Sequence, residues 1–202
     1  QIGKAFRNEI TPGNFTYRTR EFEQMEIEYF IKPGDAKETK RVFTAWKNDA
    51  FDWITNSLGI KKENLRFREH DQEELSHYSS MTVDVEYKFP FGWGELMGIA
   101  DRGQFDLKEH EKFSKEDLKY QDPMTNEKYL PSVIEPSFGV ERMMLTVLLD
   151  AYDEDKVGEE TRVVMRFSPK IAPVQLAILP LMKKEELAGP AKKLFEDLKA
   201  KF

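Results

Sequence analysis

Charged and aromatic side chains of complementary types occur close together near the start of the chain. Residues 1–10 and 22–30 each alternate between polar and apolar side chains, which predicts two strands joined by a loop. Because side chains alternate across a strand, one face of this pair would carry Arg7, Glu9, Phe22, Gln24 and Glu26. An exposed sheet face with cross-strand ion pairs would explain these residues equally well.

Two further arginines favour an anion-binding site over a merely solvated face. Arg18 and Arg20 lie in the predicted loop between the two strands. A planar guanidinium group binds phosphate oxygens through parallel hydrogen bonds, so these residues suit a phosphate ligand. The overall charge does not attract a polyanion, because 37 acidic residues against 31 basic ones give a net charge of −6. Any nucleic acid must therefore be bound by a local patch.

A second group of candidate residues lies between 131 and 142, where a strand is predicted to turn directly into a helix. Glu135 and Ser137 would point to the same side of that strand, and Arg142 would lie in the first helical turn. A cation is unfavourable at the positive end of a helix, so Arg142 requires either an ion pair or a bound anion. An ion pair with Glu141 is the slightly favoured interpretation.

Several other chemistries are excluded or poorly supported. The 202 residues contain no cysteine, which excludes disulfides, thiolate zinc sites and cysteine nucleophiles. The glycines do not have the spacing of a dinucleotide-binding loop, and there is no P-loop. The histidines lack paired metal-ligand spacing and are expected to be ordinary surface residues: His70, His77 and His110. No apolar run resembles a signal peptide or a membrane span, which predicts a soluble, cytoplasmic protein.

The remaining patterns predict an α+β fold, with an antiparallel sheet flanked by helices. Helical spacing of apolar residues occurs over 42–58 and 140–151, and strands are expected over 81–89, 93–101 and 162–167. The strand over 81–89 is expected to be half-exposed, with Thr82, Asp84, Glu86 and Lys88 on its outer side. Residues 108–128 are expected to form a surface insertion, and residues 153–160 a solvated loop.

The end of the chain has a different character. Residues 168–173 are expected to be a linker, residues 174–181 a buried parallel strand, and Leu187 to Phe202 a helix. One strand and one helix do not close a core, so they are expected to begin a second domain. The first residue is Gln1 and not methionine, so the chain is expected to be an excised or processed piece.

These segments resemble motifs of the class II aminoacyl-tRNA synthetases, in the form found in the glycine-specific enzymes. Residues 6–9 with 18–26 resemble the second signature motif of that family. Residues 131–142, reading Pro-Ser-Val-Ile-Glu-Pro-Ser-Phe-Gly-Val-Glu-Arg, resemble the third. Residues 94–102 resemble the strand of the glycine pocket, and residues 172–202 the first strand and helix of the anticodon-binding domain. The resemblance covers nearly the whole chain, and two motifs in this order are highly specific.

The resemblance implies a domain organisation and a reaction. Residues 1–167 would form an N-terminally truncated catalytic core, and residues 168–202 would begin an α/β anticodon-binding domain. The reaction would activate glycine with ATP to glycyl-adenylate and transfer it to the 3′ end of tRNA(Gly), with Mg²⁺ bound to the ATP. The family's first motif, which forms its homodimer interface, is absent from these residues, as is an upstream acid expected at the glycine ammonium group.

The resemblance also implies roles for individual residues. Arg7 would hold the α-phosphate and the glycine carboxylate, Glu9 the adenine or ribose, and Arg18 the γ-phosphate. Phe22 and Arg142 would stack on opposite faces of the adenine. Glu135 would serve the magnesium ion, and Arg102 would lie near the α-phosphate, so that Arg7, Arg102 and Glu135 are the expected catalytic residues. Glycine would be bound by Arg7, Glu26, Glu95 and Ser137.

Two alternatives remain beside this interpretation. A noncatalytic synthetase-like protein that binds RNA or a partner would not need the full ATP set of Arg7, Glu9, Glu135 and Arg142. A class II synthetase for another small amino acid is disfavoured by Glu26 and Ser137, which resemble the glycine-specific residues.

Overall fold

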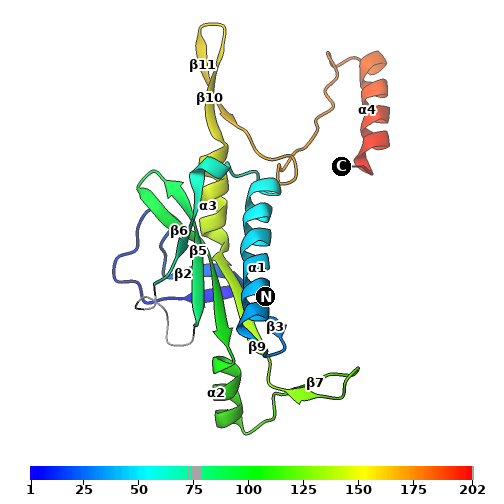
Figure 1. The fold of residues 1–202 in the computed structure, drawn as a ribbon. Coiled ribbons are helices and arrows are strands. Elements are labelled where there is room, and N and C mark those ends of the chain that lie inside the picture. The colour runs from blue at the N-terminus through cyan, green and yellow to red at the C-terminus, as the bar shows by residue number, and fades with distance from the viewer. Residues whose placement is uncertain (72, 74–78, 202) are drawn as a thin grey trace. The chain divides into compact units, whose positions relative to one another are not determined.

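The computed structural model describes residues 1–71, 73 and 79–201, so His77 and Phe202 lie outside the described residues. The chain divides into two compact units, Gln1–Arg166 and Phe167–Phe202. The first unit contains the main sheet and all the residues predicted to do chemistry (Figure 1). The function of the chain must therefore be sought first in this unit.

Within the described residues, the main sheet has seven strands and is antiparallel throughout. Its order is β1-β2-β9-β6-β5-β4, with β3 paired to the other end of β9. The strands are β1 (Ile2–Phe6), β2 (Glu21–Glu26), β3 (Tyr29–Ile31), β4 (Leu65–Glu69), β5 (Met81–Phe89), β6 (Gly92–Gly103) and β9 (Ser132–Gly139). This arrangement confirms the predicted antiparallel sheet, and it inserts β9 between the N-terminal strands and the central hairpin β5–β6.

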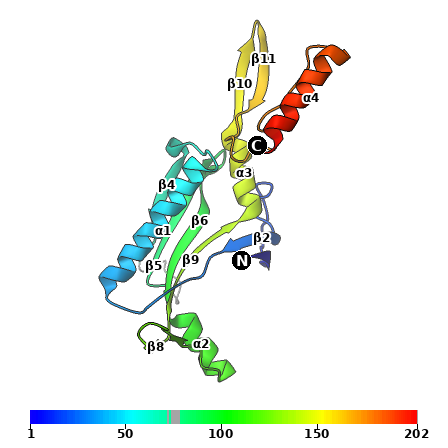
Figure 2. The same cartoon turned by 90° about the vertical axis from the view of Figure 1, so that its right-hand side faces the viewer.

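The core forms where α1 (Ala36–Asn56) packs on one face of the sheet (Figure 2). Val83 and Val85 of β5 are at most 1% exposed and belong to one buried cluster with Ile54 of α1. The alternation predicted over 81–89 thus places its apolar side in the core. Residues that alternate with these valines, such as Asp84, must point to the opposite face of the sheet.

The helices begin and end where local signals allow. At the start of α1, the Asp35 side chain accepts a hydrogen bond from the Lys37 backbone N–H, as in an ordinary N-cap. The second helix of the core, α3 (Val140–Ala151), follows β9 directly and begins after Gly139 without a side-chain cap. Both helices confirm the periodicity of the sequence. Among the described residues, no helix combines the length and the apolar character that crossing a membrane requires.

Several sequence expectations about this unit are wrong in detail. The first strand ends at Phe6 and not at Ile10, and its apolar side chains are exposed: Ile2 is 61% and Phe6 71% exposed. β1 lies at the edge of the sheet and contributes no residue to the hydrophobic core. The second expected strand is divided into β2 and β3, because the chain leaves its pairing with Ser137 at Glu26 and pairs again with β9 from Tyr29. The outer side of β5 is buried rather than half-exposed at Asp84 and Glu86.

Two segments expected to be irregular contain regular structure. The expected loop 153–160 lies mostly in an antiparallel hairpin of β10 (Tyr152–Val157) and β11 (Glu160–Met165). Its acidic residues pair with arginines of the facing strand, for example Asp155 with Arg162, which makes a charged hairpin favourable. The expected insertion 108–128 contains most of α2 (Phe105–Ser114) and a ribbon of β7 (Tyr120–Gln121) and β8 (Lys128–Tyr129).

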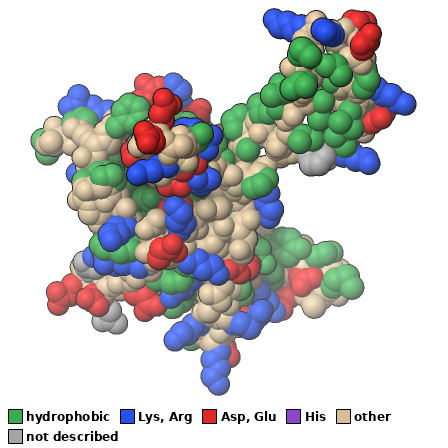
Figure 3. Space-filling model, turned by 90° about the horizontal axis from the view of Figure 1, so that it is seen from above, with side chains coloured by type: hydrophobic (Ala, Val, Ile, Leu, Met, Phe, Trp, Pro, Cys, Tyr) green, Lys and Arg blue, Asp and Glu red, His purple; other side chains and the backbone are tan. Residues whose placement is uncertain are grey.

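The second unit consists of an extended segment and α4 (Glu185–Lys199). The expected buried strand 174–181 is not formed, and Leu179 and Leu181 are 84% and 87% exposed. A strand requires a neighbour for its backbone hydrogen bonds, and no described strand pairs with this segment. Hydrophobic side chains therefore gather on the surface of this unit, as the green atoms of Figure 3 show. The helix expected from Leu187 is confirmed up to Lys199.

Candidate active site

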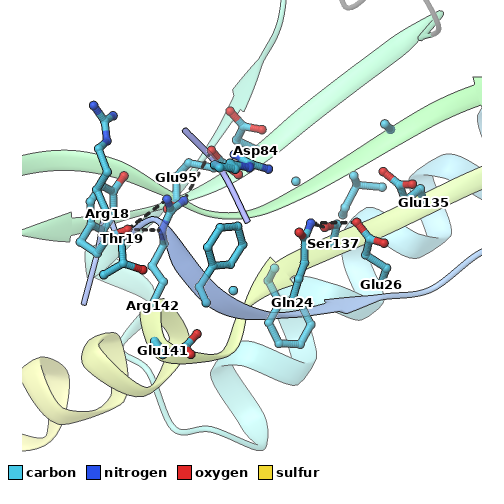
Figure 4. A pocket seen from close by; sticks show the side chains of 18 of the residues that line it. Arg18, Thr19, Gln24, Glu26, Asp84, Glu95, Glu135, Ser137, Glu141 and Arg142 are labelled. Atoms are coloured by element: carbon cyan, nitrogen blue, oxygen red, sulfur yellow. Dashed lines mark hydrogen bonds and ion pairs between the residues drawn. The ribbon is translucent and has the colours of Figure 1, made fainter. Parts of the chain in front are cut away.

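A cavity of about 420 Å³ opens on the sheet face opposite to α1. Its lining comes from the segment between β1 and β2, the strands β2, β5, β6 and β9, and the first turn of α3 (Figure 4). All the site residues expected from the sequence contribute to it: Arg7, Glu9, Arg18, Phe22, Glu26, Glu95, Arg102, Glu135, Ser137 and Arg142. The fold thus brings both candidate groups, from the start and the middle of the chain, to one cavity. Their individual roles remain predictions.

The right-hand part of Figure 4 contains a polar network across β2 and β9. Glu26 is paired in register with Ser137. Gln24 donates from Nε2 to Ser137 Oγ at 2.7 Å and to Glu26 Oε1 at 2.8 Å. These bonds fix the orientation of a carboxylate and a hydroxyl oxygen on the cavity floor. Both are acceptors that could bind an ammonium group.

Arg102 is held from two sides. Its Nη1 donates to both carboxylate oxygens of Glu135 at 3.0 Å. Its Nε and Nη2 donate to Asp106, in the first turn of α2, at 2.6 and 2.9 Å. The hydrogen bond from Arg102 lowers the pKa of Asp106 below its ordinary value. The guanidinium is therefore a preoriented cation at the edge of the cavity.

Arg142 does not form the expected ion pair with Glu141. The Glu141 carboxylate instead accepts the backbone N–H of Glu23 at 2.9 Å, while Arg142 Nη1 donates to the carbonyl of Glu95 at 2.8 Å. The Arg142 guanidinium also lies 3.5 Å from the Glu95 carboxylate and 4.2 Å from the centre of the Tyr17 ring. Arg142 contacts Glu95 because β6, which contains Glu95, pairs with β9, and β9 leads directly into α3. This proximity cannot be read from the spacing of the two residues in the sequence.

The loop before β2 is anchored by Tyr17. The Tyr17 ring packs edge-on against Phe89 and Phe91, with ring centres 4.8 and 4.9 Å apart. Paired backbone hydrogen bonds between Gly13 and Arg18, at 3.0 and 3.2 Å, close the loop. Arg18 thereby reaches the cavity wall. The guanidinium of Arg7, another residue that lines the cavity, lies 5.5 Å from the centre of the Phe22 ring.

His70 and Asp84 are cavity residues that the sequence reasoning missed. His70 was expected on the surface, but its Nε2 lies 2.7 Å from Oδ2 of Asp84, which is 7% exposed. Burial raises the pKa of Asp84, and the hydrogen bond to His70 opposes this shift. The alternation over 81–89 does place Asp84 on the polar side of the strand. Only the pairing of β5 with β6 shows that this side faces the cavity.

A magnesium ion accompanying a nucleotide would fit the carboxylates beside Arg102. Burial and a hydrogen bond to Glu135 raise the pKa of Glu28 to about 7, so two carboxyl groups meet here. The described residues contain no group of three or more potential metal ligands. Mg²⁺ in nucleotide sites usually takes one or two carboxylates plus phosphate oxygens, and Glu135, which lines the cavity, would supply one of them.

Curated relatives that match the chain include glycine–tRNA ligases from several bacteria. The ligase of Caldanaerobacter subterraneus subsp. tengcongensis is 59% identical over 202 residues, which are 100% of this chain and 42% of that protein. The ligase of Acetivibrio thermocellus is 61% identical over 203 residues, covering 100% of this chain and 43% of the relative. The ligase of Staphylococcus aureus is 58% identical over 204 residues, again with 100% and 43% covered. The chain thus spans less than half the length of these relatives.

Among solved structures, the chain matches a prolyl-tRNA synthetase from Cryptosporidium parvum, solved with L-proline and AMP. The TM-score is 0.68 at 18% identity, and the match covers 99% of this chain and 40% of that protein. At this identity the likeness shows the fold alone. No family model matches the chain. The chain is thus homologous over its whole length to part of the glycine–tRNA ligases, and it has the catalytic fold of the class II aminoacyl-tRNA synthetases.

Proposed function

We propose that the chain forms most of the catalytic site of a glycine–tRNA ligase, which activates glycine with ATP and transfers it to tRNA(Gly). The observation that carries this proposal is the convergence of all the expected site residues on one cavity, in a chain about 60% identical to such ligases. The tRNA, a homodimer of the full-length parent protein and a cytoplasmic location belong to the same proposal.

The proposed first step is in-line attack of a glycine carboxylate oxygen on the α-phosphorus of ATP, with pyrophosphate as the leaving group. The bond from the α-phosphorus to the bridging oxygen breaks, and the electron pair leaves with the pyrophosphate. Arg7 and Arg102 neutralise the charge that develops on the phosphoryl oxygens. When bound, Mg²⁺ screens charge on the phosphates. No protein nucleophile is required, which agrees with a site built from arginines and carboxylates.

The other roles follow from position in the cavity. Arg18 would bind the γ-phosphate, Glu9 the adenine or ribose, and Phe22 the face of the adenine. Arg142 would reach the adenine after exchanging its contact with Tyr17 for the nucleotide. Glu26, Glu95 and Ser137 would bind the glycine. Residues 168–202 would begin the anticodon-binding domain.

The test is amino-acid-dependent exchange of pyrophosphate into ATP, together with calorimetry of Mg–ATP binding to the 202-residue chain. We expect nucleotide binding, and exchange with glycine but not with L-alanine or L-proline. A pocket without room for a methyl group rejects these amino acids by steric overlap. Pyrophosphate exchange that depends on another amino acid would show that glycine is not the substrate. Absence of nucleotide binding would overturn the proposed function.

A further inference from the structure

A row of residues in register crosses the floor of the cavity over four adjacent strands. Glu26 of β2 is paired with Ser137 of β9, Ser137 with Gly98 of β6, and Gly98 with Asp84 of β5. Residues opposite each other in a sheet point to the same face, and all four line the cavity. The proposed function uses Glu26 and Ser137 but leaves Asp84 without a role.

The middle of this row carries no side chain. A Cβ atom on Gly98 would lie 3.7 Å from Asp84 Oδ1 and 3.9 Å from Glu95 Oε1, both ordinary contact distances. The space above Gly98 is therefore open and is bounded by Asp84 on one side and Ser137 on the other. Two strand spacings separate these residues, about 10 Å between backbones. Such a gap accepts a ligand of a few heavy atoms between two polar walls.

The contacts of Asp84 leave one carboxylate oxygen directed at this gap. His70 lies 2.7 Å and the Arg68 guanidinium 3.7 Å from Oδ2. Oδ1 is the oxygen nearest to the space above Gly98. The hydrogen bond to His70 and the charge of Arg68 lower the pKa of Asp84, against the larger rise that burial causes. Asp84 thus presents a carboxylate oxygen to the cavity from the side opposite to Ser137 and Glu26.

We infer that Asp84 is a specificity-determining residue that binds the α-ammonium group of a side-chain-free amino acid seated above Gly98. This inference rests on the proposed function and deepens it. An ammonium group has three donors; Oδ1 of Asp84 accepts one, and Ser137 with Glu26 accepts from the opposite side. The backbone of Gly98 forms the floor beneath the substrate's α-carbon. His70 is a positioning residue, which holds Asp84 through Oδ2.

The first test is calorimetry of the 202-residue chain with glycine in the presence of Mg²⁺ and α,β-methylene-ATP. We expect Asp84→Asn to weaken glycine binding at least about tenfold, because it removes a charge-assisted hydrogen bond, and to leave nucleotide binding unchanged. Glu86→Gln is the matched control. Glu86 is on the same strand, is 8% exposed and is paired with Arg66, but it does not line the cavity.

A second ligand separates ammonium recognition from a structural effect. Glycolate has a hydroxyl group in place of the ammonium group. The unmodified chain should prefer glycine to glycolate, and Asp84→Asn should reduce this preference about tenfold. A merely structural defect would weaken both ligands and the nucleotide together, and would overturn the inference.

Gly98→Ala gives an independent test, because the added methyl group fits the protein without overlap. The melting temperature should therefore stay within about 2 °C, while glycine binding falls at least tenfold because the methyl group fills the substrate's place. Glycine binding unchanged in Asp84→Asn and Gly98→Ala would overturn this inference and leave the proposed function intact. A chain that binds nucleotide but neither glycine nor another amino acid would contradict both.

Discussion

Arg7 is the side chain on which the proposed in-line geometry depends most. It lies just after β1 with its guanidinium near Phe22 and its backbone N–H bonded to Arg20, so the backbone holds it at the cavity. One planar cation would hold both reacting groups. We expect Arg7→Ala to reduce glycine-dependent pyrophosphate exchange at least ~100-fold. Lys4→Ala removes an exposed cation of the neighbouring strand β1 and should have little effect. Exchange within a few-fold of the unmodified chain would exclude this role.

Glu26 is the residue that should separate the two substrates kinetically. Its carboxylate is oriented by Gln24. Glu26 also belongs to the row of residues in register that is proposed to bind glycine. Glu26→Gln should raise the glycine KM at least several-fold more than the ATP KM, since the lost contact is to the ammonium group. Steady-state exchange at varied glycine and varied ATP measures both constants. Equal weakening of both substrates would identify Glu26 as a structural residue of the sheet.

The residues that sequence reasoning identified and missed differ in one physical respect. Arg7, Glu135 and Arg142 belong to segments whose residue order itself resembles a family motif. Asp84 and His70 are joined only by the pairing of β4 with β5, which requires the tertiary fold. The predicted ion pair of Arg142 with Glu141 was wrong for the same reason, because its actual partner, Glu95, is distant in sequence.

At the scale of elements, the docking of the loop before β2 depends on a position without a side chain. A Cβ on Gly94 would lie 2.5 Å from the Tyr17 hydroxyl and 3.2 Å from Phe89 Cδ2. Gly94→Ala should therefore displace the Tyr17 ring and speed hydrogen exchange of the Arg18 amide, which donates to Gly13, at least about tenfold. Gly3→Ala, with open space around it, is the control. Unchanged exchange would show that Tyr17 does not anchor the loop.

The hairpin β10–β11 should lose order in acid. The hydrogen bond from Arg162 holds the pKa of Asp155 below its ordinary value of 3.8, and Arg166 does the same for Asp153. A lowered pKa stabilises the fold above the ordinary value, and that stabilisation is lost as the pH falls through the lowered value. Cross-strand nuclear Overhauser effects between Lys156 and Thr161, which are paired, should weaken from pH 5 to pH 2. Asp155→Asn should reduce this pH dependence; a hairpin intact at pH 2 would contradict the prediction.

The elements themselves were predictable where burial follows a simple period. The runs 42–58 and 81–89 were identified because one face of each is buried in the core. The prediction of a buried strand over 174–181 was wrong because no neighbouring element among the described residues covers this segment. Its apolar run is typical of a buried strand, but hydrophobicity predicts burial only if a neighbouring element covers it, and Leu179 is exposed. The acidic residues around 155 were taken for a loop because cross-strand arginine pairing is invisible in local sequence.

At the scale of the whole molecule, the charge distribution bears on tRNA binding. The chain has a net charge of −6, and the face in Figure 3 mixes basic with acidic side chains. Phosphate contacts dominate nucleic-acid affinity and are weakened by salt. We expect the 202-residue chain to bind tRNA weakly, without preference for tRNA(Gly), and to release it between about 50 and 200 mM salt. Filter binding with cognate and noncognate tRNA would test this. Salt-resistant preference for tRNA(Gly) would reveal recognition residues in this chain.

The position of β9 in the sheet has a consequence for the order of folding. β4, β5 and β6 are neighbours both in sequence and in space, so they can pair early with little loss of loop entropy. β2 has to wait for β9, which emerges from the ribosome about a hundred residues later. During synthesis the first thirty residues thus remain without their central partner. The cavity is lined both by residues near the start of the chain and by residues of β9. It should therefore be the last part of the domain to form, and a bound nucleotide would stabilise it.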